Sequence, residues 1–275
     1  GTSGGTCIPP RGTLEAMKYE LETIPVWDAY EQSADCPLCY LKEKAEADYV
    51  NFFLGNSVMI PEIRVEVNKN GFCPRHYGMM FRGKNKLGLA LLTKTHMETR
   101  LQEVDAGLAS VEKAAGGGGL AGALLKRDAK VASARLAASL TEREAACGVC
   151  TKLTNTVANY TFTIVHLYKK NDDFPETFRA SAGFCLHHVP QVVEMAISHL
   201  KTDRLKDFCG DLRRCLTTHA DSLGTKLEQF TEKFDYHNAN APLAPGAKEA
   251  LPRSIHALTG NFELNPRTTT PRAST

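Results

Sequence analysis

The sequence predicts an all-α protein built from two pseudo-repeated Cys3His metal-binding modules. Two observations lead to this prediction. One motif occurs twice, as C-x2-C, a long spacer and then G-F-C-x2-H. The segments around both copies place apolar residues at helical spacing, without the sustained alternation that is typical of strands.

The two copies of the motif have nearly equal lengths. The first starts at Cys36 and the second at Cys147, and 33 and 34 residues separate the second and third cysteines. Zinc prefers four thiolate or imidazole ligands in a tetrahedron, and ligand spacings of this kind are typical of zinc sites. We therefore predict two Zn2+ ions per chain, one for each copy, with two ligand sets: Cys36, Cys39, Cys73 and His76, then Cys147, Cys150, Cys185 and His188.

Two neighbouring histidines compete for the last position of the second set. Aligning the copies places His188 opposite His76 and His187 opposite Arg75, which stays protonated and cannot bind zinc. On a helix start, residues three apart share a face. The alignment therefore predicts that His188 is the ligand, together with Cys185.

Other interpretations of the cysteines stay open. An iron–sulfur cluster is one, although cysteines normally supply all of its ligands. Thiol redox chemistry at Cys36-Pro-Leu-Cys39 is another, but the βαβ pattern of thioredoxin-like proteins is missing. Buried cysteines without metal are a third. A further group, Cys209, Cys215 and His219, suggests a third metal site, but core cysteines and a surface histidine are the preferred interpretation.

The order of helices follows from apolar spacing and from helix-breaking residues. Pro37 is well placed at the first position of a helix that ends near Leu54, with Asp35 as its cap. Pro-Glu pairs open a short helix in each copy, and Gly71 ends the first of them. Further helices are expected near Cys73, after Cys150 and over 87–111, 128–145, 189–199 and 205–234, with a docked turn over 251–258.

These elements predict a modular organisation. Gly116-Gly-Gly-Gly119 cannot remain helical at reasonable cost, so we place the boundary between modules there. The expected parts are a non-native or disordered leader over 1–16 (including Cys7), a first module over 17–112, a Gly-rich linker over 113–127, a second module over 128–236 and a mostly irregular tail over 237–275.

Composition and motifs limit the function. A net charge of +2 gives no reason to expect nucleic-acid binding, and no apolar run approaches the roughly 18 residues that a spanning helix needs. The start of the sequence lacks a signal-peptide profile, which favours a cytoplasmic location. There is no nucleophile elbow, Walker loop, H-E-x-x-H motif or dinucleotide fingerprint. We therefore expect a non-enzymatic scaffold or interaction module with an unidentified protein partner, and a redox protein is the alternative.

A family resemblance supports the same interpretation. The segment from Met17 to Asp28, the C-P-L-C and G-F-C-P-R-H motifs, the second C-x2-C with G-F-C-L-x-H, and Phe234-Asp-Tyr are similar to a family of uncharacterised bacterial proteins. That family is frequent in anaerobic Firmicutes and is catalogued only as a domain of unknown function. The resemblance covers about residues 17–260. It implies a cytoplasmic bacterial protein and brings no established activity or catalytic residue.

Overall fold

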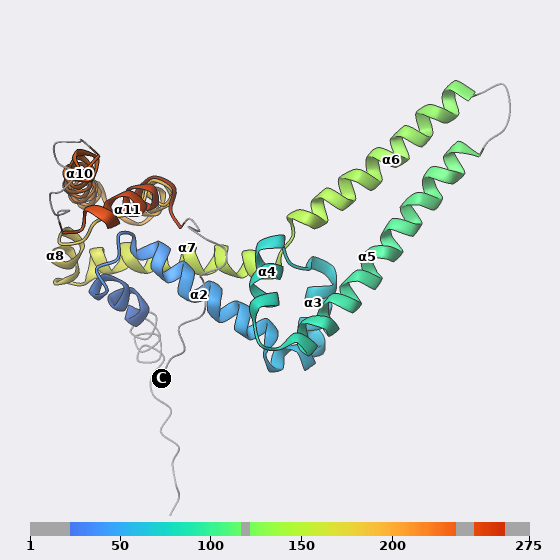
Figure 1. The fold of residues 1–275 in the computed structure, drawn as a ribbon, viewed down its shortest axis with the longest axis horizontal. Coiled ribbons are helices and arrows are strands. Elements are labelled where there is room, and N and C mark those ends of the chain that lie inside the picture. The colour runs from blue at the N-terminus through green and yellow to red at the C-terminus, as the bar shows by residue number, and fades with distance from the viewer. Residues whose placement is uncertain (1–22, 117–121, 235–244, 262–275) are drawn as a thin grey trace, which may run out of the picture. The chain divides into compact units, whose positions relative to one another are not determined.

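The structure is a computed structural model that describes residues 23–116, 122–234 and 245–261 (Figure 1). Across these ranges the regular elements are helices, without a strand, which confirms the predicted all-α class. The expected leader over 1–16, with Cys7, lies outside the described residues. Among the helices described, none is long and apolar enough to cross a membrane.

The chain divides into two compact units. Unit 1 consists of Gly1–Lys44 and Thr156–Thr275, and unit 2 is Ala45–Asn155. Both boundaries fall inside helices, because the first lies in α2 (Pro37–Leu54) and the second in α7 (Gly148–Lys170). The Gly-rich segment that we expected to separate two modules lies within unit 2. The observed division therefore differs from the expected modules over 17–112 and 128–236.

Unit 2 contains the end of α2 and the start of α7, with a series of helices between them. Proline opens α3 and α4, where a missing amide hydrogen costs nothing. The 3-10 helix η1, which we did not predict, precedes α3. The elements are η1 (Asn56–Met59), α3 (Pro61–Asn70), α4 (Pro74–Arg82), α5 (Lys86–Ala115) and α6 (Gly122–Ala145).

Gly71 ends α3, as predicted, and fixes the approach to the first G-F-C segment. Its φ of 60° lies in the region that favours glycine. A Cβ atom at this position would lie 2.5 Å from Nε2 of His96. The His96 Nδ1 atom in turn lies 2.9 Å from the carbonyl oxygen of Asn68. Glycine is therefore required here by both the backbone conformation and the packing of the His96 ring.

The core of unit 2 joins the two motif segments directly. Phe53 and Phe72 pack edge to face, with ring centroids 5.1 Å apart. The amide of Gly148 donates a hydrogen bond of 3.1 Å to the carbonyl oxygen of Gly71. This bond holds the start of α7 against the first G-F-C segment. As a result, the second C-x2-C motif lies beside the first C-x2-H motif.

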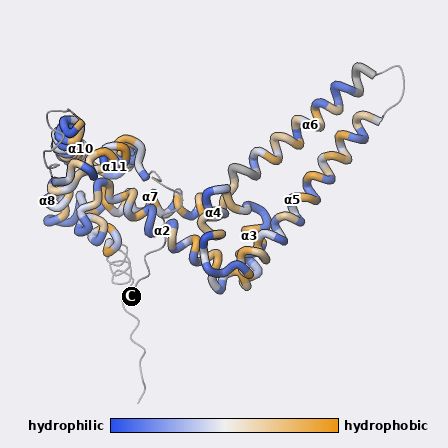
Figure 2. The backbone as a smooth tube through the Cα atoms, in the orientation of Figure 1, coloured by the Kyte–Doolittle hydropathy of each residue, from blue (hydrophilic) through white to orange (hydrophobic). Residues whose placement is uncertain are grey.

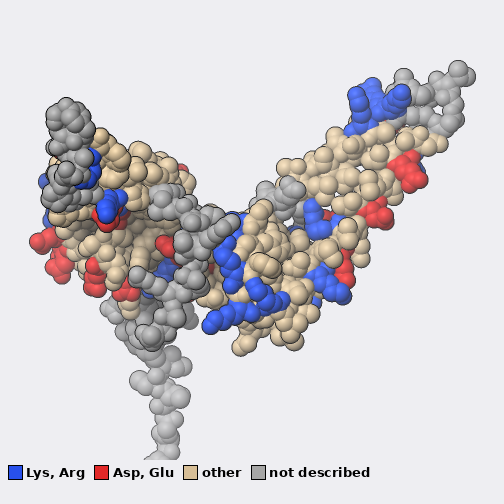
Figure 3. Space-filling view, in the orientation of Figure 1, with Lys and Arg blue, Asp and Glu red and all other residues tan. Residues whose placement is uncertain are grey.

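The α5–α6 hairpin extends from the rest of unit 2 (Figure 1). Figure 2 shows hydrophobic and hydrophilic positions interspersed along both helices. Figure 3 shows basic side chains near the start of α6 and acidic ones along α5. Met97, Leu101 and Leu108 of α5 remain more than half exposed. The hairpin therefore presents apolar side chains in a charged surface.

Unit 1 is built on an aromatic core. Tyr168, Phe178 and Phe208 are buried, and their ring centroids lie 4.9 to 5.3 Å apart. These rings join α7 to the helices that follow, at the spacing that aromatic pairs prefer. Those helices are α8 (Phe174–Arg179), α9 (Val189–His199), α10 (Thr202–Glu232) and α11 (Ala247–Thr259).

The helix α11 is longer than the predicted turn over 251–258, and it lies within the segment 237–275 that we expected to be mostly irregular. Arg253 of α11 pairs with the carboxylate of Asp35 through its Nε and Nη2 atoms, and the Nε to Oδ1 distance is 3.0 Å. Asp35 is the residue that we expected to cap α2. It anchors α11 beside the start of α2.

Candidate metal centres

The eight predicted ligands form two clusters, but with exchanged partners. Cluster A, in unit 1, contains Cys36, Cys39, Cys185 and His188, and cluster B, in unit 2, contains Cys73, His76, Cys147 and Cys150. In each cluster the four candidate ligand atoms lie within 4.8 Å of one another. The C-x2-C of each copy thus meets the C-x2-H of the other copy. Our expectation of one ligand set within each copy must be corrected.

Helix length explains the exchange. Each C-x2-C lies at the start of a long helix, α2 with 18 residues or α7 with 23. At about 1.5 Å per residue, these helices carry the chain about 27 and 35 Å before it turns. The C-x2-H segment of the same copy follows at the far end of its helix. There it meets the start of the other long helix.

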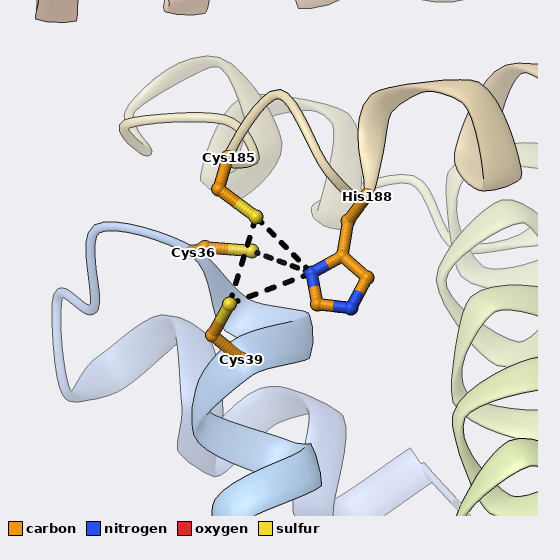
Figure 4. Close-up of side chains that lie close together, drawn as sticks. All are labelled: Cys36, Cys39, Cys185 and His188. Atoms are coloured by element: carbon orange, nitrogen blue, oxygen red, sulfur yellow. Dashed lines mark hydrogen bonds between the residues drawn. The ribbon is translucent and has the colours of Figure 1, made fainter. Parts of the chain in front are cut away.

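Cluster A has the geometry of a ligand set around one ion. The three sulfur atoms lie 3.5 Å (Cys36), 3.4 Å (Cys39) and 3.2 Å (Cys185) from Nδ1 of His188. The sulfurs of Cys39 and Cys185 are 3.6 Å apart. Figure 4 shows the four side chains converging on a common centre from the start of α2 and the segment before α9.

Cluster B repeats this arrangement at the starts of α4 and α7. Nδ1 of His76 lies 3.1 Å from the sulfur of Cys73, 3.3 Å from that of Cys147 and 3.4 Å from that of Cys150. The sulfurs of Cys73 and Cys150 are 3.9 Å apart. The Cys150 amide donates to the Cys147 sulfur at 3.5 Å, as expected for a thiol at a helix N-terminus.

These distances between sulfur and nitrogen atoms match those expected between ligands of one tetrahedral ion. With zinc–sulfur bonds of about 2.3 Å and zinc–nitrogen bonds of about 2.0 to 2.1 Å, tetrahedral angles place sulfurs about 3.8 Å apart and sulfur and nitrogen about 3.6 Å apart. The observed values are 3.6 and 3.9 Å between sulfurs, and 3.1 to 3.5 Å between sulfur and nitrogen. The donor set of three thiols and one imidazole also suits zinc. Both clusters can therefore hold a metal ion.

In each cluster the neighbouring groups favour the thiolate form of one cysteine over that of the others. Burial would raise the pKa of Cys147, but hydrogen bonding to His76 outweighs it and lowers the pKa to about 6. Hydrogen bonds from Cys36 and Cys39 lower the pKa of Cys185. Burial, together with the neighbouring Cys185, raises the pKa of Cys36 to about 12. Metal binding must displace the protons that remain, so metal affinity should increase with pH.

A buried carboxylate orients the histidine of cluster B. Glu46, which is 5% exposed, has Oε1 2.9 Å from Nε2 of His76. Arg75 donates to both of its oxygens, at 3.0 and 2.8 Å. Burial would raise the pKa of Glu46, but these two hydrogen-bond partners outweigh it and lower the pKa to about 2. Carboxylate–histidine pairs of this kind fix the ring orientation of metal ligands.

Sequence reasoning missed Glu46, although one signal was present. Glu46 lies seven residues from both Cys39 and Phe53, so the three share a face of α2, and the other two are buried. An acidic residue on that face needs a buried partner. The equivalent position of the second copy holds Val157, which packs in the same core as three ligands of cluster A. The two clusters therefore have different surroundings.

The clusters also differ in exposure. The four residues of cluster A are all buried, whereas Cys73 and Cys150 of cluster B are partly exposed. The end of α11 covers cluster A. The Asn261 side chain donates to the Cys39 carbonyl at 3.2 Å. A Cβ atom at Gly260 would lie 3.5 Å from the sulfur of Cys185 and 3.7 Å from that of Cys39.

The remaining candidates lie outside these clusters. His188 is in cluster A and His187 is not, in agreement with the prediction from the alignment of the two copies. Cys209 is exposed, and the sulfur of Cys215 contacts the carbonyl oxygen of Phe178 at 3.4 Å. In the described part of the chain, neither belongs to a metal-ligating group with His219. Lys152, two residues after Cys150, forms an ion pair of 3.5 Å with Glu66.

The fold and the two clusters define the class, an all-α protein with two Cys3His groups that can each hold a metal ion. Residues 17–265 match the sequence pattern of DUF6062, a family of unknown function. The chain belongs to this family. Neither a curated protein nor a solved structure matches the chain significantly.

Proposed function

We propose that each cluster binds one Zn2+ ion as a structural centre, and that the chain is a non-enzymatic helical scaffold or interaction module. The observation behind this proposal is the separation of the ligand atoms, all within 4.8 Å in each cluster. Four protein ligands fill a tetrahedral ion, so no position remains for a catalytic water.

The same separations favour zinc over an iron–sulfur cluster. In a cluster of several irons the cysteines are divided among different metal atoms, so their sulfurs are spread more widely than around one shared ion. A histidine in each group also departs from the usual set of four cysteines. The separations of 3.6 Å between Cys39 and Cys185 and 3.9 Å between Cys73 and Cys150 support a single ion.

A structural role follows from what each ion would connect. In cluster A the ion would join the start of α2 to the segment before α9, more than 140 residues later. Ligands that meet only in the folded chain make metal binding part of the folding free energy. The two ions would then stabilise helices whose exposed surfaces bind a partner. The α5–α6 hairpin, with its exposed Met97, Leu101 and Leu108, is a surface of this kind.

A reducing bacterial cytoplasm is the location that we propose. The eight cysteines within the described ranges are free, and thiolate ligands persist where thiols stay reduced. The partner that we infer is a protein that packs on the exposed apolar side chains of the hairpin.

Elemental analysis of anaerobically purified full-length protein tests the proposal. We expect about two zinc ions per chain, a colourless protein, and a lower melting temperature after chelation, because the ions contribute to folding. Stoichiometric iron and sulfide in a brown protein would overturn the zinc assignment. Full metal removal without any change in melting temperature would overturn the structural role.

Thiol redox chemistry at cluster B is the second candidate. Cys73 and Cys150 are partly exposed, and their sulfurs are 3.9 Å apart. An oxidant such as peroxide would take two electrons from the two thiols, form a disulfide and yield two water molecules. Mass spectrometry after peroxide treatment distinguishes the two functions. Reversible Cys73–Cys150 disulfide formation in the zinc-loaded protein favours the redox role, and an unmodified protein favours the structural one.

A further inference from the structure

A groove lies along α10 in unit 1, and no ligand of cluster A lines it. It consists of two adjoining hollows of ≈ 460 and ≈ 330 Å³. Both are lined by Arg179, Asp211 and Arg214, so they form one continuous surface, which we call the α10 groove. Hollows of this size are in the range that small-molecule ligands occupy, roughly 300 to 1,000 Å³.

The α10 groove carries an excess of positive charge. Its charged lining consists of four cationic side chains and two carboxylates, a formal excess of two positive charges with His219 neutral. The six side chains are Arg179, Arg204, Lys206 and Arg214, then Asp207 and Asp211. Cations gathered in a hollow attract anions more strongly than cations spread over a convex surface. The groove is therefore suited to an anionic ligand.

Asp211 holds two of the arginines in place. It is 3% exposed and accepts a hydrogen bond of 2.7 Å from the Tyr168 hydroxyl. It also accepts from Nη1 of Arg179 at 3.3 Å and from Nη2 of Arg214. A guanidinium group has five N–H donors, so each arginine has donors beyond the one that Asp211 uses. The side chains of Arg179 and Arg214 are 47% and 71% exposed.

Further hydrogen-bonding groups line the same surface. Thr218 and Ser222 supply hydroxyl groups, whereas the Ser181 hydroxyl already donates to the carbonyl oxygen of Phe178 at 2.7 Å. The Nε2 atom of His219 is buried and has no hydrogen-bond partner, and the nearest carboxylate oxygen, from Asp35, is 3.7 Å away. A buried polar atom without a partner costs free energy unless a ligand or water satisfies it. These polar groups lie in the same hollow as Arg179 and Arg214.

We propose that the α10 groove binds a small molecule through a phosphate or diphosphate group. Two guanidinium groups fixed beside each other can present paired donors to the oxygens of a phosphate. The excess of two charges matches a phosphate dianion better than a single carboxylate. The combined hollows are larger than free phosphate, which fits a phosphate ester whose organic part lies along α10.

Isothermal titration calorimetry on the metal-loaded full chain at low salt tests this proposal. The probes are inorganic phosphate, pyrophosphate and AMP, with succinate as a carboxylate comparison. We expect saturable binding of pyrophosphate and AMP, and weak or no binding of succinate. Tighter binding of AMP than of phosphate would identify an ester as the ligand, and equal binding would identify free phosphate.

Neighbouring arginines supply matched variants. Arg214→Gln and Arg179→Gln should weaken pyrophosphate binding by about tenfold, the loss of one charged hydrogen bond. Arg213→Gln removes the same charge from an exposed position of α10 outside the groove, and it should change binding less than twofold. Arg214→Lys keeps the charge and loses the planar fork, so it should still weaken binding.

Three results would overturn the proposal. One is the absence of saturable binding of any phosphate probe in the wild-type protein. Another is an equal loss in Arg213→Gln and Arg214→Gln, which would indicate attraction by net charge alone. The third is equal binding of succinate and pyrophosphate. Circular dichroism confirms that each variant is folded, and because the side chains of Arg179 and Arg214 are 47% and 71% exposed, we expect them all to fold.

Discussion

The sulfur atoms of Cys39 and Cys185 lie 3.6 Å apart, although 146 positions separate the two residues in the chain. This contact joins the first C-x2-C to the second C-x2-H. It shows that the two motif copies exchange partners, so that neither copy builds a site by itself. Each ligand group depends on the folding of distant parts of the chain.

Double variants test the exchange of partners. Cys39→Ser combined with Cys185→Ser should lose about one zinc ion, because both residues belong to cluster A. Cys39→Ser combined with Cys73→Ser should lose both ions, because one residue of each cluster is removed. If each copy formed its own site, the two results would be reversed. Elemental analysis after gel filtration measures the difference.

The two adjacent histidines of the second motif provide a second test. His188 lies in cluster A, with Nδ1 3.2 Å from the sulfur of Cys185, and His187 is outside the cluster. His188→Ala should release zinc at chelator concentrations that leave His187→Ala fully loaded. Competition with a coloured chelator measures both variants. Loss of metal from His187→Ala, with retention in His188→Ala, would contradict the ligand assignment.

Glu46 should affect the zinc affinity of cluster B and leave that of cluster A unchanged. Its carboxylate accepts from Arg75 and lies 2.9 Å from Nε2 of His76. Glu46→Gln should lower zinc affinity at cluster B by about 10- to 100-fold, as is typical for loss of such a partner, and leave cluster A unchanged.

A matched control for this variant is Glu66→Gln in the same unit. Glu66 forms a partly exposed ion pair with Lys152 at 3.5 Å, a kind of contact that contributes little. The control should keep both affinities. Equal zinc affinities in Glu46→Gln and wild type would show that the carboxylate does not support the metal.

Position 260, beside cluster A, should tolerate no residue other than glycine without a loss of stability. Its φ of 80° and ψ of −155° belong to a region that is almost restricted to glycine. Gly260→Ala should lower the free energy of unfolding by about 1 to 3 kcal/mol through backbone strain, and it should hasten zinc release from cluster A.

Gly224 provides the control for that variant. It lies within α10, and a Cβ atom added there would have nothing within 4 Å, so Gly224→Ala should stabilise the protein by about 0.5 to 1 kcal/mol. Urea denaturation measures both changes. A Gly260→Ala variant as stable as wild type would mean that α11 does not hold its end against the cluster.

The principal helices and the identity of the eight candidate ligands could be predicted from the sequence, whereas η1 and the full length of α11 were not. Proline at the first position fixed the start of α2, and the short helix at Pro175-Glu176 appeared as predicted. Glycine at position 71 ended α3 because its φ is positive. The choice of His188 over His187 also followed from spacing. These features depend on local backbone geometry and on residue type, which a sequence displays directly.

Which ligands meet could be learned only from the tertiary structure. Spacers of 33 and 34 residues allow a site within each copy, but α2 and α7 carry the chain away from the first pair of ligands before the second pair begins. The pairing of Glu46 with Arg75 and the anchoring of α11 through Arg253 and Asp35 are likewise long-range contacts. Such contacts depend on how complete helices pack, and motif spacing contains no information about that packing.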